Sequence, residues 1–322
     1  MKTGLPRGLP QIRLVAREVR SSWATRRHHE TVPREFGMVC DGLQGASHPR
    51  DGVMAEDEQA PPDIDIRRPN MARMYDYALG GKDNFASDRE AVQNLFKLAP
   101  ENAYVPRANR QFLGKAVRFA AEQGIGQFLD LGAGLPSQNS THEVARRVQP
   151  DARVVYVDSD PVVLAHARAL LAGNDPGLTV IGEDIRNTGQ VLGDPQTRRL
   201  IDFSQPAAVL FVAVLHGIPD ADDPAGIVAQ YVRRLAPGSY VILSHLTREG
   251  HPADIVAKKE EVWAKSATPM AYRSRDEILR FFEGLDLVEP GLTTVTRWRE
   301  ESPDAQLDAA GTWTLAGVGR KN

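Results

Sequence analysis

Two apolar runs that each lead into an acidic residue constrain the fold more than any other feature of this chain. Residues 128–134 read FLDLGAG, and residues 154–161 read VVYVDSDP. Each run is typical of a buried strand, and the first continues directly into glycines that permit a tight turn. Ligands of an open parallel sheet bind at the carboxyl ends of its strands. The two runs therefore predict adjacent strands whose ends together hold a nucleoside-containing cofactor.

From residue 126 onward, strand-like and helix-like segments alternate, which indicates a doubly wound α/β fold with a parallel sheet. Asp160 and Pro161 mark a helix start, because Asp is a favoured N-cap and Pro fits the first turn. We expect strands at 127–131, 153–157, 178–182, 207–214, 240–245, 287–289 and 313–318, and helices at 141–148, 162–172, 225–235, 254–265 and 275–282.

The chain before this region divides into two parts of different composition. Residues 1–63 are rich in Arg, Gly and Pro and have no helical or strand periodicity, so we predict a disordered extension. An alternative is that part of it precedes the true start, with Met54 as the first residue. Residues 64–124 have an apolar face at helical spacing and predict a helical cap or lid, followed by a cofactor-binding domain at 125–322.

Composition excludes several classes of protein. The net charge of −3 gives no global basic field for nucleic acid, and one cysteine excludes a disulfide framework and a Cys-based zinc site. The histidines show no HxxxH or HExxH spacing, so no metal site is predicted. No apolar run approaches the roughly 20 residues of a membrane span. We therefore expect a cytoplasmic protein without a metal or membrane partner.

The glycine turn discriminates between cofactors. A dinucleotide fingerprint is GxGxxG, but here Ser137 stands at the third glycine position and Pro136 precedes it. No GxxxxGK[ST] loop for nucleotide triphosphates is present. Asp130, two residues before the first glycine, would repel a pyrophosphate but attract an ammonium group. S-adenosylmethionine has an ammonium group and an adenosine but no phosphate, so we favour it over NAD, the cofactor of a rival oxidoreductase interpretation.

Three further runs join the two already described, and the chain resembles one family across all five. They are ARMYDYALGGKDNFASDRE from residue 72, FLDLGAGLPS from 128, YVDSDPVVLAHARALL from 156, VAVLHGIPD from 212 and LAPGSYVILSH from 235. Between about residues 68 and 321 the chain resembles the actinobacterial S-adenosyl methyltransferase family, once described as a domain of unknown function. The resemblance implies the Rossmann-like class I methyltransferase fold, a mainly parallel seven-stranded sheet in which one strand of the terminal pair is antiparallel.

The ends of the first two strands supply the first candidate cofactor ligands. Asp130 would accept hydrogen bonds from the cofactor ammonium, and Gly132 and Gly134 would let the backbone approach it closely. Asp158 would take both ribose hydroxyls in charge-assisted hydrogen bonds. Asp160 is the alternative at this loop, although it has the position of a helix cap.

Further ligands follow from the resemblance. It assigns Asp184 to the adenine amino group and the backbone amide of Ile185 to the adenine ring, with Glu183 as a competitor for the first role. Val212 follows the fourth strand, where cofactor and acceptor would meet. Tyr77 and Lys82 belong to the distinctive run 75–85, which we interpret as a shaped loop that closes over the site as a lid.

The catalytic prediction concerns His216, which follows Val212 in the same loop. A histidine with an ordinary pKa near 6.5 suits a general base at neutral pH. A structural histidine is an equal alternative, and His245 at the end of the fifth strand is a second candidate for the base. The cofactor ligands are thus better marked than any catalytic residue.

These residues predict an S-adenosylmethionine-dependent methyltransferase that acts on a small molecule. The balanced charge and the absence of an NPPY- or DPPY-type motif after the fourth strand argue against a nucleic acid acceptor. The alternative is a regulatory or sensing protein that binds S-adenosylmethionine without methyl transfer. Neither the acceptor nor the oligomeric state can be predicted from the sequence.

Overall fold

The computed structural model describes residues 65–135, 139–171, 175–300 and 305–322. The chain divides into two units, Met1–Met54 and Ala55–Asn322, and all described residues lie in the second. The segment predicted to be disordered, 1–63, therefore lies outside the described residues, and so do Pro136 and Ser137 of the glycine turn.

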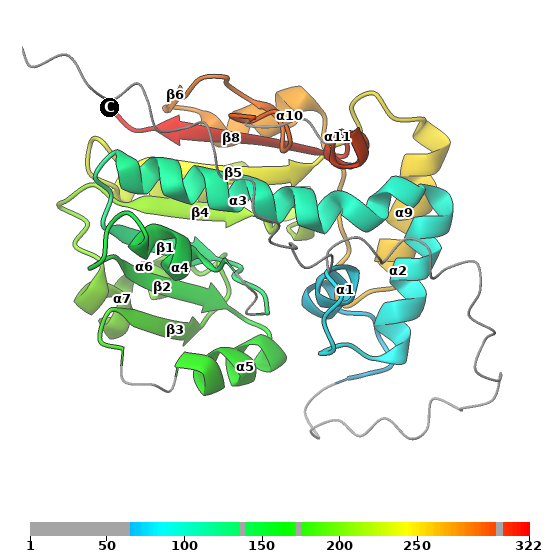
Figure 1. Cartoon of the computed structure of the whole chain (residues 1–322), viewed down its shortest axis with the longest axis horizontal. Coiled ribbons are helices and arrows are strands. Elements are labelled where there is room, and N and C mark those ends of the chain that lie inside the picture. The colour runs from blue at the N-terminus through cyan, green and yellow to red at the C-terminus, as the bar shows by residue number, and fades with distance from the viewer. Residues whose placement is uncertain (1–64, 136–138, 172–174, 301–304) are drawn as a thin grey trace, which may run out of the picture. The chain divides into compact units, whose positions relative to one another are not determined.

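In the described residues, eight strands form one sheet with the order β3-β2-β1-β4-β5-β8-β6, and β7 also pairs with β8 (Figure 1). The first five strands are parallel to one another, whereas β8 is antiparallel to β5. This arrangement confirms the predicted fold class, including the antiparallel strand near one edge. The strands are β1 Gln127–Leu131, β2 Arg153–Asp158, β3 Leu178–Gly182, β4 Ala208–Val212, β5 Tyr240–Leu246, β6 Asp286–Leu287, β7 Thr293–Thr294 and β8 Thr314–Arg320.

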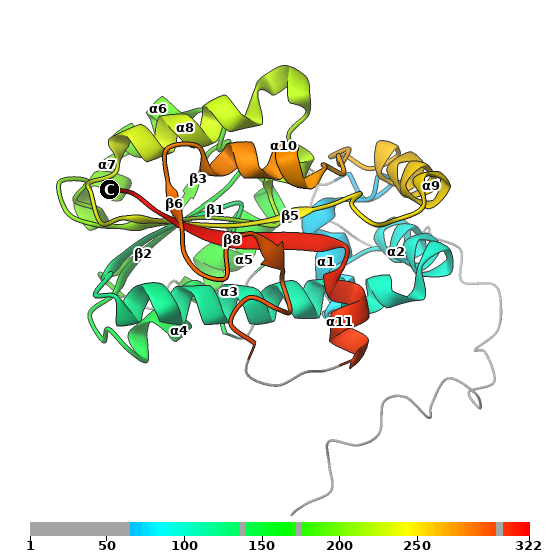
Figure 2. The same cartoon turned by 90° about the horizontal axis from the view of Figure 1, so that it is seen from above.

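Helices cover both faces of this sheet (Figure 2). One face carries α3 (Val105–Glu122), α4 (Thr141–Arg146) and α11 (Ala305–Gly311), and the other carries α6 (Thr188–Gly193), α7 (Pro195–Leu200), α8 (Pro224–Arg234) and α10 (Arg275–Leu279). Alternate residues of a strand point to opposite faces. Phe128 and Leu129 of β1 accordingly lie in two different hydrophobic cores. Burial on both faces explains why β1 and β4 are continuous apolar runs.

A third hydrophobic cluster lies beyond the carboxyl ends of the parallel strands (Figure 1). It joins α1 (Met71–Ala78) and α2 (Ala86–Leu98) to α9 (Ala253–Ala264), around Trp263 and Trp313. We call α1, α2 and α9 the cap. The short 3-10 helix η2 (Pro100–Tyr104) connects α2 to α3.

A buried ion pair fixes the first two cap helices to each other. Arg73 Nε lies 2.9 Å from an Asp88 carboxylate oxygen, and the two side chains are 3% and 0% exposed. Asp88 also accepts hydrogen bonds from the backbone amides of Asn70 and Phe85. Because a buried charge is costly unless it is paired and hydrogen-bonded, this network specifies how the cap segment folds.

Two local predictions differ from the structure. The run 75–85 was expected to be a loop, which is wrong for its first part because α1 continues to Ala78. The strand predicted at 207–214 ends at Val212, because Ala213 has a φ of 56° that a strand cannot contain. Among the residues that the structure describes, no helix combines the length and apolar character needed to cross a membrane.

Candidate functional site

A cavity of about 860 Å³ lies at the carboxyl ends of β1, β2 and β4, between the sheet and the cap. Ligand pockets for small molecules are typically about 300–1,000 Å³ in volume. Most of the predicted site residues line this cavity, although their positions in the sequence are far apart. They are Lys82, Asp130, Gly132, Gly134, Asp158, Asp184, Ile185 and Val212.

The glycine turn has a backbone that only glycine adopts readily. Gly132 and Gly134 have φ values of 70° and 66°. A side chain at Gly132 would also collide with Val214, since an added Cβ would lie 2.3 Å from its Cγ2 atom. A Cβ at Gly134 would meet no atom within 4 Å. The turn thus lets the backbone approach whatever occupies the cavity.

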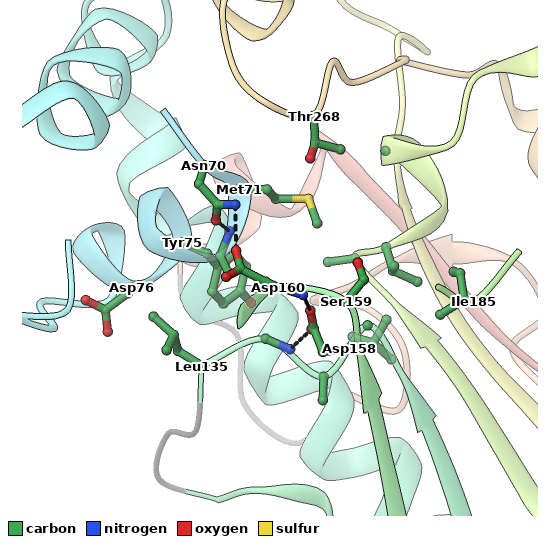
Figure 3. A pocket seen from close by; sticks show the side chains of 18 of the residues that line it. Asn70, Met71, Tyr75, Asp76, Leu135, Asp158, Ser159, Asp160, Ile185 and Thr268 are labelled. Carbon is green, nitrogen blue, oxygen red and sulfur yellow. Dashed lines mark hydrogen bonds between the residues drawn. The ribbon is translucent and has the colours of Figure 1, made fainter. Parts of the chain in front are cut away.

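The Asp158 carboxylate organises this turn from the neighbouring strand. One oxygen accepts a hydrogen bond from the Gly134 amide at 2.9 Å, and the other accepts one from the Asp160 amide at 2.9 Å (Figure 3). A carboxylate has about four acceptor sites, so about two remain for a ligand. Burial raises the pKa of Asp158 above its ordinary value.

Asp160 has a different environment from Asp158, although both line the cavity. One of its oxygens accepts a hydrogen bond from the Val162 amide at 2.7 Å, in the first turn of α5 (Pro161–Leu171). The other accepts one from the side-chain amide of Asn70 in the cap at 2.6 Å (Figure 3). The contact at Val162 agrees with the predicted cap role of Asp160, and the contact with Asn70 joins the sheet to the cap.

Asp130 lies deeper in the cavity wall. It is 5% exposed, and its carboxylate accepts a hydrogen bond from Thr141 Oγ1 at 2.6 Å. Burial raises the pKa of Asp130 to about 6, although the Thr141 hydrogen bond and the positive charge of Arg110 oppose this rise. A cationic group in the cavity would favour the ionised form of this carboxyl.

The end of β3 presents Glu183, Asp184 and Ile185 to the same cavity. The side chain of Arg186 donates hydrogen bonds to Asp184, and this contact lowers the pKa of that carboxyl. Arg186 also forms an ion pair with Asp222 at 2.7 Å. The ion pairs orient the Asp184 carboxylate at the cavity rim, and Glu183 lines the cavity beside it. Both acids therefore remain candidates for the hydrogen-bond partner of the adenine amino group.

A chain of hydrogen bonds connects the end of β4 to the cap, and most of its members were not predicted from the sequence. Ser244 Oγ accepts from the Ala213 amide at 3.0 Å and donates to Asn109 at 2.6 Å. The Asn109 side-chain amide donates to the Tyr75 hydroxyl at 3.1 Å, which in turn donates to the Pro106 carbonyl at 3.0 Å. Tyr75 and Asn109 both line the cavity, so this chain fixes its wall.

The distinctive motif of residues 75–85 is explained by contacts of Asp76. Its carboxylate accepts hydrogen bonds from the Asp83 amide at 2.8 Å and from the Asn84 side chain at 3.0 Å. An added Cβ at Gly81 would lie 1.9 Å from an Asp76 oxygen, so this position requires glycine. Lys82, at the tip of the turn, lines the cavity and is exposed. The motif therefore shapes one rim of the cavity.

Three predicted residues do not line the cavity. Tyr77 packs in the cap cluster, and its hydroxyl accepts a hydrogen bond from Gln93 at 3.3 Å. His216 and His245 are buried behind the cavity wall, with their rings 5.5 Å apart. Burial lowers the pKa of His216 to about 3, which makes it a weak base. In the described part of the chain, no group of three or more His, Cys, Asp or Glu side chains is arranged to hold a metal ion.

Comparisons with known proteins agree with this geometry. A family profile described as S-adenosyl methyltransferase matches residues 57–322. The crystal structure of a candidate methyltransferase from Thermobifida fusca YX is 43% identical, with a TM-score of 0.75, and the match covers 81% of this chain and 98% of that one. A DUF574 family protein from Streptomyces avermitilis MA-4680 is 36% identical, with a TM-score of 0.74, over 79% and 98% of the two chains. Among curated proteins, a search finds no match.

Proposed function

The chain belongs to the S-adenosyl methyltransferase family, and on this basis we propose that it methylates a small-molecule acceptor in the cavity at its strand ends. It is a methyltransferase, and S-adenosylmethionine is its cofactor. The observation that supports the proposed acceptor class is that acids from three strands and residues of the cap line one cavity of about 860 Å³. A cavity of this size suits small ligands.

The residues of the cavity fit this cofactor. Backbone with positive φ at Gly132 and Gly134 forms a cradle that a side chain would fill. Asp130 would hold the ammonium group, Asp158 the ribose hydroxyls, and the backbone and acids at the end of β3 the adenine. The same acids would repel a pyrophosphate, which disfavours the NAD interpretation.

Bound S-adenosylmethionine supplies an electrophilic methyl group and a neutral thioether leaving group. The main task of the protein is therefore to align the acceptor and to exclude water. Tyr75 and Met71 of α1 line the cavity on the cap side and would close over the acceptor. Burial raises the pKa of Tyr75, so its hydroxyl stays protonated and acts as a hydrogen-bonding group. We propose His216 as a positioning residue at most, because it does not line the cavity.

Three finer points belong to the same proposal. The net charge of −3 supports an acceptor other than nucleic acid. One cysteine in 322 residues supports a reducing compartment, and we propose the cytoplasm as the site of action. Within the segment 64–124 expected to be a cap, we propose that α1 and α2 act as the lid of the catalytic domain, because they share a hydrophobic cluster with α9 beyond the strand ends, whereas α3 packs on the sheet (Figure 2).

Calorimetry with S-adenosylhomocysteine tests the cofactor site. Asp158→Asn should weaken binding by about 10- to 100-fold, because it removes charge-assisted hydrogen bonds worth about 1.5–3 kcal/mol. Asp254→Asn is the matched control, since Asp254 is an exposed acid paired with Lys258 on α9. Equal affinity of wild type and Asp158→Asn would remove Asp158 from the site.

Transfer of a labelled methyl group tests the acceptor class. We expect label in small molecules of a cell extract after ultrafiltration, and none in its nucleic acid. Label that appears only in nucleic acid or protein would contradict a small-molecule acceptor, although it would leave the cofactor site intact.

A further inference from the structure

A second, smaller chamber adjoins the cofactor cavity on the cap side. Its volume is about 100 Å³, and it shares Met71, Tyr75, Asn109 and Ala213 with the larger cavity. Most of the remaining lining is apolar, and part of it comes from the cap helices, including Met74, Val92, Leu95, Phe96 and Trp263. The shared residues form the boundary between the two spaces, and a molecule that reached from the larger cavity into the chamber would pass between them.

Lys259 of α9 is a charged residue in the wall of this otherwise mostly apolar chamber. It lines the chamber and is only 2% exposed. Its Nζ donates to Asn102 Oδ1 at 2.8 Å and lies 3.0 Å from the centroid of the Trp313 ring. An ammonium group has three donors, and among the described residues no carboxylate lies within ion-pair distance of Lys259; the charge of Glu101, which is hydrogen-bonded to Trp313, acts on it from farther away. Burial lowers the pKa of Lys259 to about 7, although the negative charge of nearby Glu101 opposes this fall.

Two further polar atoms at this chamber lack a partner. His216 Nδ1 and Thr314 Oγ1 are buried and form no hydrogen bond within the described residues, and both residues line the chamber. Leaving a buried polar atom unsatisfied is costly, so native proteins keep few of them. The residues around this mostly apolar chamber thus include a buried ammonium and two unsatisfied polar atoms. The ammonium in particular suits an occupant with an anionic end.

We propose that the methyl acceptor carries a carboxylate on a short aliphatic segment, that this segment lies in the chamber, and that the carboxylate pairs with Lys259. The inference rests on the proposed function, because it describes the end of the methyl acceptor that lies away from the cofactor. The volume of about 100 Å³ is below the roughly 150 Å³ of a cavity that holds benzene, so a chain of three or four carbons fits better than a ring. A carboxylate there would also restore the ordinary charge of Lys259.

The test compares two probes of the same shape on wild-type protein saturated with S-adenosylhomocysteine. Isobutyrate has the proposed carboxylate, whereas isobutyramide has the same carbon skeleton and no charge. Tryptophan fluorescence reports binding, since Trp263 lines the chamber and Trp313 contacts Lys259. We expect isobutyrate to bind at least about 10-fold more tightly than isobutyramide, which is the effect of one charge-assisted contact.

Lys259→Met keeps the length of the side chain and should abolish this preference. Lys258→Met is the matched control, because Lys258 is the adjacent lysine on α9 but is exposed and paired with Asp254. Equal binding of the two probes to wild type would overturn the inference, whether or not Lys259→Met folds, and would indicate that Lys259 only holds the cap together. A preference that persists in Lys259→Met would overturn it as well. Failure of the wild type to bind S-adenosylhomocysteine would instead count against the proposed function.

Discussion

Cofactor affinity should increase with pH, and Asp130 should be the main cause. Burial raises the pKa of this carboxyl to about 6, compared with an ordinary value of 3.8. Below pH 6 the free protein therefore holds a proton on Asp130. A cofactor ammonium beside the carboxyl favours the ionised form, so binding in acid must release that proton.

The structure sets the size and the sign of this effect. Suppose that the cofactor returned the pKa of Asp130 to its ordinary value. The difference between the raised and the ordinary pKa would then correspond to about 3 kcal/mol, or about 100-fold in affinity. Affinity for the cofactor would rise as pH increases from the ordinary pKa to the raised pKa of Asp130, and it would level off above about pH 6. The stability of the free protein has the opposite sign. A carboxyl whose pKa is raised by folding stabilises the protein in acid, and this contribution is lost as pH rises through the same range.

Calorimetry with S-adenosylhomocysteine between about pH 5 and about pH 8 measures the slope, and buffers of different ionisation enthalpy count the released proton. Asp130→Asn should bind with an affinity that changes much less with pH. Asp158, whose pKa burial also raises, contributes in the same direction and accounts for a residual slope. An affinity that does not change with pH in wild type, or a full slope in Asp130→Asn, would refute the assignment of Asp130 to the ammonium group.

Three further predictions concern the turn and the cap. Gly132→Ala should destabilise the protein by more than Gly134→Ala in thermal unfolding. Both changes add the roughly 1–2 kcal/mol strain of a left-handed backbone, but only Gly132→Ala adds a collision with Val214. Equal losses of stability in the two variants would contradict this. Arg73→Met should cost about 3–5 kcal/mol in urea unfolding, since it leaves the Asp88 charge buried and unpaired, and a loss below 1 kcal/mol would mean that the pair is not essential. Asn70→Ala removes the N-cap of α1 and the hydrogen bond to Asp160, and it should cost about 1 kcal/mol or more, with faster amide exchange in α1 and in the loop after β2. Unchanged exchange in α1 would exclude the capping role.

The sheet and the cofactor ligands could be predicted because the sequence encodes them locally. A strand buried on both faces must be a continuous apolar run, and its carboxyl end is where a parallel sheet places ligands. Asp130 and Asp158 follow from this rule alone, and the structure brings both into one cavity. The bounds of β1 and β3 were predicted to the residue for the same reason.

Other parts of the molecule depend on contacts between distant segments. Helices α6, α7 and α11 and strand β7 are short, and no local pattern distinguished them from loops. Asn109 and Ser244 belong to the wall of the cavity only because α3 and β5 meet there, 135 residues apart in sequence. Tyr77 was chosen over Tyr75 within one motif, yet only Tyr75 lines the cavity, because residues two apart on a helix point to opposite sides of it.

The hydrogen bonds at the strand ends also indicate why this site would bind its cofactor with little rearrangement. Asp158 already fixes the turn at Gly134 and the loop at Asp160, and Asp160 in turn contacts Asn70 of the cap. A ligand that meets groups held in place beforehand loses less free energy to ordering than one that must fix them. Because one connected set of bonds reaches from the glycine turn to the start of α1, disorder in the cap would also loosen the carboxylate that we assign to the ribose. The cap and the cofactor site should therefore lose order together.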